Sequence, residues 1–385
     1  MWCSAVVCNT SFSMRIDRLT LSGFRNYETE SLSFDPSCNV IYGENAQGKT
    51  NLLEAIVYLS CGKSPRTRTD RDLISFDRQE AKLRGEIFAR ERPFVTEIAL
   101  QKGRRRKMTV NGVTAKNGAA LSDVLHTVFF SPEDLFLIRD GAAARRRFMD
   151  LSLCQLRPRY AEALAEYHRL YEHKTRILRD SEEQPSLLSM LPDFNEQMCR
   201  AGAVLIHYRA RYCQALDRYA APAHEDCSGG REKLTIRYQS VSTIEDPLAP
   251  AAQLLEALRR HQAEHDRAER ASRLCLSGPH KDDFLVEVNG LAARQYCSQG
   301  QVRTAALALK LADREIHRSA VGEYPVMLLD DVLSELDGER QNHLLSAIDH
   351  IQTMITCTGL DEFVNSKFRM DKIFKIVEGT VESED

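Results

Sequence analysis

The sequence predicts an α/β protein that contains a nucleotide-binding domain and a helix-rich region. Three observations carry this prediction: a phosphate-binding loop between an apolar strand and a helix, a second apolar strand that ends in two carboxylates, and a long helical stretch between them. The chain of 385 residues is long enough for two or three compact units. Its hydrophobic content of 43% and charged content of 28% are those of an ordinary globular protein.

The phosphate-binding loop is a complete GxxxxGK[ST] match, made of Gly43, Glu44, Asn45, Ala46, Gln47, Gly48, Lys49 and Thr50. Residues 38–42 precede it as a strand, and Asn51 opens a stretch to residue 59 with helical periodicity. Glycines let successive N–H groups point at phosphates, and the helix N-terminus adds partial positive charge. We expect Lys49 to reach the β- and γ-phosphates and the Thr50 hydroxyl to hold Mg²⁺. A chance match in a glycine-bearing turn is the alternative.

The elements before and after this loop follow from periodicity. An alternating strand begins at Met14, and residues 1–13 are either a disordered extension or lie before the true start at Met14. Residues 14–130 are β-rich, with a hairpin at residues 95–110 beside the Asn111-Gly112 turn signal. Residues 143–220 carry an apolar stripe of helical spacing, and Pro158 is expected to start a helix.

The second half of the sequence has more interruptions between its predicted helices and strands. We expect loops at residues 182–192 and 221–230, a helix at 250–270, and a hairpin formed by residues 284–288 and 291–296. Strands follow at residues 326–329, 353–356 and 372–377, with a helix at 339–348 and a frayed acidic tail at 378–385.

Two carboxylates end the strand at residues 326–329. In a phosphate-loop enzyme, Asp330 at this strand tip is expected to hold Mg²⁺ through its water shell, and Asp331 to polarise the attacking water. Because aspartates also favour helix N-caps, a capping pair is the alternative. The phosphate loop upstream favours the catalytic interpretation.

A second anion-binding element is predicted at Ser298, Gln299, Gly300 and Gln301, which open a strongly helical stretch at residues 302–315. The serine hydroxyl, the glycine backbone and the helix N-terminus all favour an anion. Alone, the tetrapeptide could be a simple helix cap. The tetrapeptide is stronger evidence for an anion-binding element because it precedes the Asp330-Asp331 pair and then the Ser-Glu-Leu-Asp segment that ends at Asp337.

That order of motifs resembles the ATP-binding-cassette superfamily, whose members sandwich two nucleotides between two heads. The resemblance implies that the signature serine contacts the γ-phosphate bound by the opposite head. Since this chain has one loop and one signature, it implies a homodimer with composite sites. The long separation of Lys49 from Ser298 disfavours transporter subunits, and the stretch is too short for cohesin-like arms.

Within that superfamily, the chain resembles the RecF family of bacterial recombination mediators. The matching segments span Met14 to about Thr358 and comprise residues 23–27, 62–67, 130–135, 145–150, 277–283, 298–304 and 329–337. Three departures are visible: the leader before Met14, Lys281 in place of the usual arginine, and Leu333 in place of an aromatic residue.

The resemblance implies an ABC-type ATPase head without long coiled-coil arms. Residues 14–130 and 318–385 would form lobe I, and residues 131–317 a helical lobe II that carries the signature. It implies that ATP with Mg²⁺ closes the dimer and that slow hydrolysis opens it. The resemblance implies catalytic roles for Asp331, Lys49, Ser298 and Gln301. It implies nucleotide contacts for residues 43–51 and 298–300, and it places Asp337 at the subunit boundary. Arg25 and Arg66 are weaker candidates for nucleotide or DNA contact, with a salt bridge as the alternative.

The same resemblance implies partners. They are DNA, notably double-strand/single-strand junctions beside gaps, RecR and RecO, and functionally RecA, which is loaded onto gapped DNA. His280 is a candidate γ-phosphate sensor, and a purely structural role for this histidine is an equal alternative. A transporter energy subunit and an ATP-closed clamp with incidental hydrolysis are competing functions.

Bulk charge constrains any contact with DNA. The net charge of −3 and pI of about 6.4 exclude wholesale electrostatic binding, so local basic patches are needed. Candidates are residues 103–107 and 145–147, for which a solvated face is the alternative. Eleven scattered cysteines without metal-ligand spacing, and no convincing signal peptide, indicate reduced thiols in the cytoplasm. No apolar run reaches the ~20 residues that span a bilayer.

Overall fold

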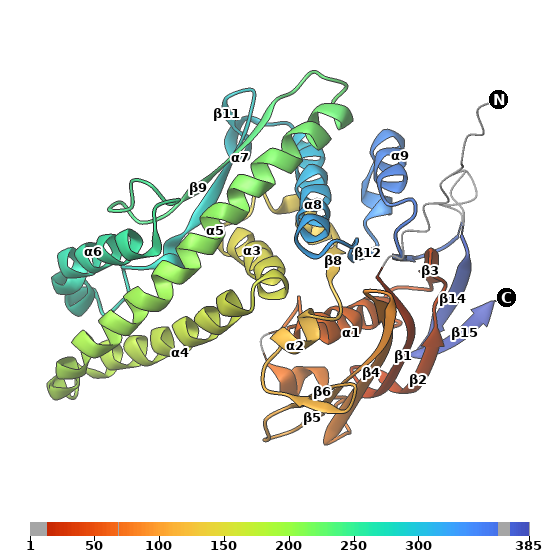
Figure 1. Cartoon of the computed structure of the whole chain (residues 1–385), viewed down its shortest axis with the longest axis horizontal. Helices are drawn as coiled ribbons and strands as arrows, with labels where there is room; N and C mark the ends of the chain where they lie inside the picture. The colour runs from red at the N-terminus through yellow and green to blue at the C-terminus, as the bar shows by residue number, and fades with distance from the viewer. Residues whose placement is uncertain (1–13, 68, 361–369, 385) are drawn as a thin grey trace, which may run out of the picture. The chain divides into compact units, whose positions relative to one another are not determined.

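The computed structural model describes residues 14–384, apart from residue 68 and residues 361–369. The prediction for residues 1–13 lies outside this range. The chain forms two compact units, one made of residues up to 129, 317–334 and 348 onward, the other of residues 130–316 and 335–347 (Figure 1).

The first unit contains an antiparallel sheet in the order β2-β1-β4-β5-β6-β7. Its strands are β1 (Arg15–Phe24), β2 (Tyr27–Ser33), β4 (Glu80–Ala89), β5 (Arg92–Gln101), β6 (Lys107–Val110) and β7 (Val113–Ala115). Alternate residues are buried, as Leu19 and Leu21 show on β1, because one face packs inward and the other meets solvent.

A second sheet of this unit has the order β15-β14-β3-β13-β12-β8. Its strands are β3 (Cys38–Tyr42), β8 (Thr127–Phe130), β12 (Val326–Asp330), β13 (Thr353–Cys357), β14 (Lys372–Val377) and β15 (Thr380–Glu384). Strands β14, β3, β13 and β12 run parallel, so their carboxyl ends meet at one edge. Strands β12 and β13 are buried along their whole length, which explains their continuous apolar runs.

Helix α1 (Lys49–Cys61) contacts β4 and β5 of the first sheet and β12 and β13 of the second. Nearly all of its side chains are buried. Both helix ends are glycines in left-handed conformation, Gly48 with φ 118° and Gly62 with φ 64°. Short helices in this unit are η1 (Asp70–Leu73) and α2 (Ala119–Ser122).

The second unit is mainly helical. Its long helices are α3 (Ala142–Leu156), α4 (Pro158–Asp180), α5 (Leu191–Cys227), α6 (Ala251–Ser272), α8 (Gln299–Val321, whose last residues belong to the first unit) and α9 (Gly338–Ala347). Its small antiparallel sheet is β9 (Leu234–Gln239), β10 (Asp283–Val288) and β11 (Leu291–Ala292). Short helices are η2 (Pro132–Phe136), η3 (Pro185–Met190), η4 (Pro279–Lys281), η5 (Leu333–Glu335, shared with the first unit) and α7 (Ala293–Tyr296). The start of α4 at Pro158 confirms the prediction.

Helix α5 is the spine of this unit, since it contacts α3, α4, α6, α9 and β9. The predicted loop at residues 221–230 is wrong for residues 221–227, because α5 continues through Pro222 to Cys227, and only residues 228–230 form a turn. Leu216, Ala220 and His224, which follow one another at intervals of four residues along α5, are all buried. Their packing therefore outweighs the loss of the backbone hydrogen bond that Pro222 cannot donate. The predicted loop at 182–192 also contains η3 and the first residues of α5.

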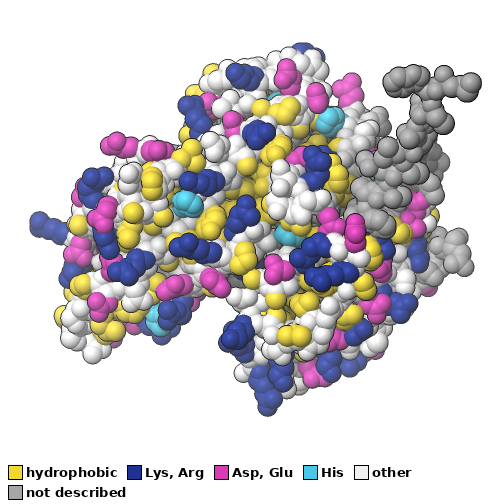
Figure 2. Space-filling view, in the orientation of Figure 1, with side chains coloured by type: hydrophobic (Ala, Val, Ile, Leu, Met, Phe, Trp, Pro, Cys, Tyr) yellow, Lys and Arg dark blue, Asp and Glu magenta, His cyan; other side chains and the backbone are white. Residues whose placement is uncertain are grey.

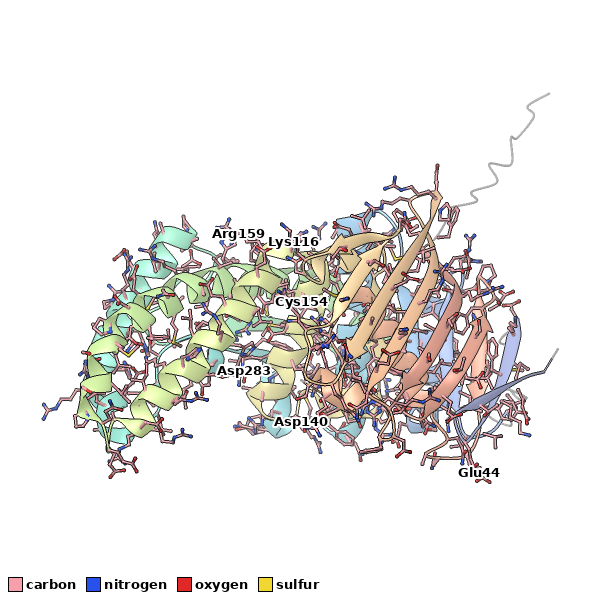
Figure 3. The ribbon with its side chains drawn as sticks, turned by 90° about the horizontal axis from the view of Figure 1, so that it is seen from below. Glu44, Lys116, Asp140, Cys154, Arg159 and Asp283 are labelled. Atoms are coloured by element: carbon pink, nitrogen blue, oxygen red, sulfur yellow. The ribbon has the colours of Figure 1, made fainter. Side chains whose placement is uncertain are left out.

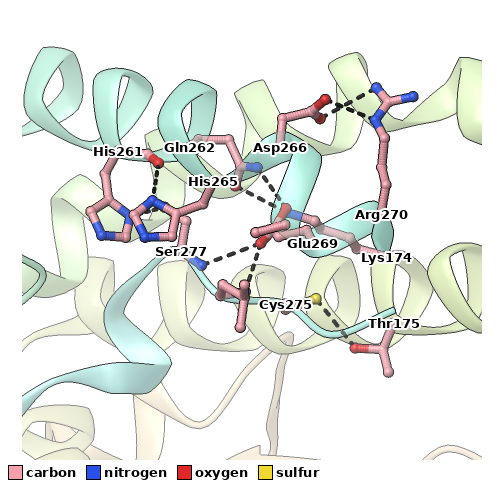
Figure 4. Close-up of polar contacts among 12 residues, drawn as sticks. Lys174, Thr175, His261, Gln262, His265, Asp266, Glu269, Arg270, Cys275 and Ser277 are labelled. Atoms are coloured by element: carbon pink, nitrogen blue, oxygen red, sulfur yellow. Dashed lines mark hydrogen bonds and ion pairs between the residues drawn. The ribbon is translucent and has the colours of Figure 1, made fainter. Parts of the chain in front are cut away.

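Buried ion pairs cross the helical unit. The Lys174 ammonium, fully buried on α4, lies 2.6 Å from the Glu269 carboxylate of α6. Glu269 also accepts hydrogen bonds from Gln262 and from the Ser277 backbone, as Figure 4 shows. Because a buried charge is costly unless it is paired and hydrogen-bonded, this cluster fixes the loop before residues 277–283.

Two further predictions need correction. The described part of the predicted frayed tail, residues 378–384, is ordered, because residues 380–384 pair with β14 through a turn with positive φ at Glu378 and Gly379. The second strand of the 284–296 hairpin spans only Leu291–Ala292, and α7 follows it.

One boundary differs from the predicted lobes. Residues 335–347 group with the helical unit, whereas the sequence prediction places residues 318–385 in lobe I. The reason is a set of side-chain contacts onto α8: Arg303 binds the Glu335 carbonyl at 2.5 Å, and Arg340 binds Thr304 at 2.8 Å.

Candidate nucleotide-binding and hydrolysis site

The phosphate loop connects β3 to α1, as the sequence predicts. Gly43 has φ 153°, and a Cβ there would stand 2.4 Å from the Ile376 carbonyl oxygen. Gly48 has φ 118°, and its Cβ would meet the Asn26 amide at 2.7 Å. Side chains are therefore excluded from both ends of the loop, which leaves a backbone cradle. Figure 3 shows Glu44 of this loop at the edge of the first unit.

Lys49 is buried and its ammonium lies on the inner side of the loop. It donates to the carbonyls of Gly43 at 2.5 Å and Glu44 at 2.9 Å. The ammonium is thus held at the place where phosphates bound by the loop would lie.

Asp330 ends β12 beside the first turn of α1. Its Oδ1 accepts from the Thr50 hydroxyl at 3.0 Å and from the Thr356 hydroxyl at 2.8 Å. Parallel strands place their carboxyl ends at one edge, which brings Asp330 next to the loop although 280 residues separate it from Thr50. Sequence reasoning missed Thr356, whose only signal was its position at the end of another apolar strand.

Asp331 follows with a left-handed backbone. Its φ is 51°, a left-handed conformation that is uncommon for residues other than glycine, asparagine and aspartate. Its N–H donates to the Thr356 hydroxyl at 2.9 Å, and its carbonyl accepts from Ser334 at 2.8 Å. The carboxylate Oδ1 is buried and has no hydrogen-bond partner among the described residues. A buried carboxylate oxygen without a hydrogen-bond partner is typical of functional sites.

These residues fit a magnesium ion. Thr50 and Asp330 supply the hard oxygen ligands that Mg²⁺ prefers. Their oxygens lie 3.0 Å apart, so both would face the same hydrated ion, with Asp330 acting through its water shell.

A segment near the start of the chain packs on the phosphate loop. Asn26 donates to the Gln47 carbonyl at 2.8 Å, and the Tyr27 hydroxyl donates to the Gly48 carbonyl at 2.9 Å. Asn51 in turn donates to Asn26 at 2.8 Å. The resemblance pointed to residues 23–27, but only the structure shows that they brace the loop.

Arg25 and Arg66 both approach Glu54, a fully buried carboxylate on α1. Arg25 forms two hydrogen bonds with Glu54, of 2.9 and 2.8 Å, while Arg66 lies 3.5 Å from it and donates to Asn51 at 2.7 Å. Arg25 is thus engaged in the salt bridge named as the alternative. Arg66 is about half exposed beside Asn51, so it keeps free surface for a ligand.

The signature residues belong to the second unit. Ser298 precedes α8, and its hydroxyl accepts from the Gln301 N–H at 3.2 Å, while the Ser298 N–H donates to the Gln301 side chain at 2.8 Å. This reciprocal pair is a capping box. Ser298 and Gln299 are exposed, so the helix N-terminus remains open to an anion.

Asp337 also caps a helix. Its carboxylate accepts from the Arg340 N–H at 3.1 Å at the start of α9 and is paired with the Arg340 guanidinium. That backbone hydrogen bond, with the guanidinium beside it, lowers the pKa of Asp337.

His280 lies inside the helical unit with both ring nitrogens engaged. Nδ1 lies 2.7 Å from the Tyr167 hydroxyl, and Nε2 lies 3.1 Å from the Cys275 carbonyl. Burial lowers the pKa of His280 to about 4. These contacts support the structural alternative over a γ-phosphate sensor.

The two basic runs differ in the structure. Arg145 is buried and paired with Asp283 at 2.6 Å, and Arg146 donates to the Asp282 carbonyl at 2.7 Å, so these two residues of the 145–147 run hold the helical unit together. In the 103–107 run, Arg106 turns inward to Asp70, while Arg104, Arg105 and Lys107 are exposed. Figure 2 shows Lys and Arg side chains mixed with acidic ones over most of this face, with a group of basic side chains at its lower edge over β5 and β6.

Both the sequence and the fold are similar to those of known proteins. The family model described as the RecF/RecN/SMC N-terminal domain matches residues 15–382. The chain is 41% identical over 374 residues to the DNA replication and repair protein RecF of Agathobacter rectalis, covering 96% of this chain and 99% of that protein. RecF of Listeria innocua is 40% identical over 374 residues with the same coverage.

The chain belongs to the RecF family. A solved RecF structure, described as the recombination mediator RecF-ATPrS in the RecFOR pathway, matches with a TM-score of 0.88 and 32% identity, covering 97% of this chain and 99% of the other. The Smc head domain of Pyrococcus furiosus matches with a TM-score of 0.52 at 16% identity, covering 96% of each chain. The fold is therefore that of an ABC-type ATPase head, and the described residues include no long coiled-coil arms. None of the described helices is long and apolar enough to cross a membrane.

Proposed function

We propose that this chain is an ATP-dependent DNA-binding clamp of recombinational repair. The observation that carries the proposal is the phosphate loop beside Asp330 and the unsatisfied Asp331 carboxylate. Similar RecF structures are described as RecF-ATP and RecF-ATPrS, which supports ATP as the nucleotide. The family's DNA replication and repair name supports the cellular role.

The chemistry follows from the site. The loop N–H groups and Lys49 bind the β- and γ-phosphates, and Thr50 and Asp330 hold Mg²⁺, which neutralises phosphate charge when bound. Asp331 orients the water that attacks the γ-phosphate, since its free oxygen is a ready acceptor. Ser298 and the N-terminus of α8 bind the γ-phosphate held by a second copy of the chain, so ATP closes a homodimer and hydrolysis releases it.

We further propose that the closed dimer binds DNA beside single-stranded gaps and acts with RecR and RecO to promote RecA loading. The RecFOR pathway named for similar structures supports these partners. Because the chain has a net charge of −3, contacts are expected to be local, directed at phosphates and strongly salt-dependent.

The deciding experiment measures mass in solution by analytical ultracentrifugation, with and without ATP·Mg²⁺. Wild type is expected to dimerise only with nucleotide, and Ser298→Arg to remain monomeric while still binding ATP. Ser189→Arg, an added charge at an exposed position on η3, serves as the control and should dimerise normally. A monomer under every condition would refute the clamp.

The competing functions make different predictions. A transporter subunit would need a membrane partner and would not bind gapped DNA in a nucleotide-dependent way. A clamp with incidental hydrolysis would release DNA equally well in Asp331→Asn, whereas the proposed switch should retain DNA in that variant.

A further inference from the structure

The signature turn is held by side chains that lie outside it. On one side, the Gln301 amide nitrogen donates to the Glu232 carboxylate at 2.8 Å. The other Glu232 oxygen lies 3.0 Å from Nε2 of His224, a fully buried residue on α5. Glu232 thus ties the signature glutamine to the spine of the helical unit.

The chemistry of Glu232 determines which way the Gln301 amide faces. An ionised carboxylate only accepts hydrogen bonds, so it selects the amide NH₂ and turns Oε1 away from itself. That same Oε1 accepts the Ser298 N–H at 2.8 Å in the capping box. If the amide were reversed, an oxygen would face the carboxylate and an NH₂ would face an N–H. Glu232 therefore fixes Ser298 through Gln301.

On the other side, Arg340 of α9 holds the same turn. Its Nη2 donates to the Gly300 carbonyl at 3.0 Å, and its Nε donates to the Thr304 hydroxyl at 2.8 Å. The guanidinium is also paired with Asp337. A Cβ at Gly300 would come within 3.3 Å of Nη2, so the motif glycine leaves the space that this arginine occupies.

We propose that Glu232 and Arg340 are positioning residues that preset the signature turn for the γ-phosphate of a second copy. This inference rests on the proposed function. Neither side chain would touch the nucleotide; both act by keeping the Ser298 hydroxyl and the first N–H groups of α8 in a binding-ready arrangement before dimerisation. Preorganisation of this kind raises affinity because ordering costs are met in the free protein.

The test compares Glu232→Ala and Glu232→Gln with Glu225→Ala, which removes an exposed carboxylate from the end of α5. The ATP·Mg²⁺-dependent dimer constant is measured by sedimentation, and ATP binding to the monomer by titration calorimetry. Loss of a charge-assisted hydrogen bond is expected to weaken dimerisation about tenfold per site, and about a hundredfold for two equivalent sites. Monomer ATP affinity should stay within about twofold, and Glu232→Gln, which keeps one acceptor oxygen for Gln301 but loses the charge and gains an NH₂, should recover only part of the loss.

Two further measurements separate positioning from general destabilisation. Adding Gln301→Ala to Glu232→Ala should cost less than Gln301→Ala costs the wild-type protein, because the two changes share the Glu232–Gln301 link. Hydrogen exchange at the Gln301 and Val302 amides should accelerate in Glu232→Ala and not in Glu225→Ala. Hydrogen exchange can be measured even if the wild-type protein fails to dimerise. Failure to dimerise would refute the proposed function, but it would not refute the role of Glu232 in positioning the signature turn.

Arg340 is tested in the same way. Arg340→Ala should weaken dimerisation to a similar degree, and Arg340→Lys should restore little, since a lysine cannot hold Gly300 and Thr304 together. A folded Glu232→Ala protein with wild-type dimer affinity and wild-type exchange would overturn the proposal. If Glu232→Ala does not fold, Glu232→Asp, which shortens the reach by one methylene, takes its place with the same expected results.

Discussion

Asp331 combines a left-handed backbone, an N–H and a carbonyl that are both hydrogen-bonded, and a carboxylate oxygen that is buried without a partner. The backbone contacts hold the residue in this left-handed conformation, which aspartate tolerates better than most residues. One carboxylate oxygen is left free to accept a hydrogen bond, which is what a residue that orients a water needs.

Asp331→Asn is expected to lower ATP turnover by about a hundredfold or more, since general-base or water-positioning groups contribute roughly 10²–10⁴. ATP binding and dimerisation should persist, because the amide keeps the shape of the carboxylate. Phosphate release under single-turnover conditions measures the effect, with Asp77→Asn, an exposed residue of the first unit, as the control. Wild-type turnover in Asp331→Asn would remove the catalytic assignment.

Asp330 gives a separate prediction that concerns the metal. Asp330→Asn removes the negative charge that would hold the ion through its water shell, so half-maximal ATP binding should require about tenfold more Mg²⁺. Nucleotide affinity in EDTA should match wild type, because the loop N–H groups and Lys49 are unchanged. A titration of Mg²⁺ at fixed ATP tests this, and an unaltered midpoint would argue against Asp330 as a ligand.

Among the elements, the β14–β15 hairpin contributes most unexpectedly to the site. Its turn contacts the phosphate loop: the Gly379 N–H donates to the Gln47 carbonyl at 3.0 Å, and the Glu378 N–H donates to the Gln47 side chain at 2.5 Å. The acidic residues of this segment suggested a frayed tail. Pairing with β14 satisfies its backbone instead, and the turn braces the loop through its hydrogen bonds to Gln47.

Gly379→Ala should therefore weaken ATP binding as well as stability. Its φ is 77°, and a Cβ would stand 2.3 Å from the Asn26 carbonyl oxygen. Gly230→Ala is the matched control, because its φ is 74° with nothing within 4 Å. The control should lose about 1 kcal/mol of unfolding free energy from backbone strain, and Gly379→Ala should lose about 1–3 kcal/mol more, with at least tenfold weaker ATP binding. Equal effects in the two variants, by urea denaturation and calorimetry, would contradict the bracing role.

For the whole molecule, buried neutral histidines make stability sensitive to acid. His126 and His317 lie in the first unit with their Nδ1 atoms 3.0 Å apart, and burial lowers the pKa of each to about 3. An unfolded histidine has a pKa of about 6.5, so the unfolded state binds more protons once the pH falls below that value. Their contribution is complete above about pH 6.5 and is lost progressively as the pH falls toward 3.

Each of these two histidines should make the unfolding free energy about 1.4 kcal/mol lower at pH 5.5 than at pH 7.5. Melting temperatures at the two pH values measure the loss. The double variant His126→Asn with His317→Asn should show a smaller pH dependence, even if its stability at pH 7.5 is lower. His350→Asn, at a side chain that is 90% exposed, should not change the pH dependence. An unchanged slope in the double variant would show that the pair does not carry this effect.

Local chemistry by itself determined the nucleotide-binding class. A phosphate loop needs glycines, a lysine and a hydroxyl in consecutive positions, so Gly43, Lys49 and Thr50 could be read directly. The apolar strands and the helix caps at Ser298 and Pro158 are likewise short-range features. Joint motifs along most of the chain indicated the RecF family before any fold was known.

Only the tertiary structure decided which residues support those motifs. Thr356, Glu54, Glu232 and Arg340 carry no local signature, because their roles depend on contacts between segments far apart in the chain. Burial also overrode local breakers: α5 passes through Pro222, and the acidic end of the chain becomes β15. Propensity acts within a few residues, whereas packing and hydrogen-bond satisfaction are settled by the whole fold, so the sequence specified the reactive groups and the structure specified what holds them in place.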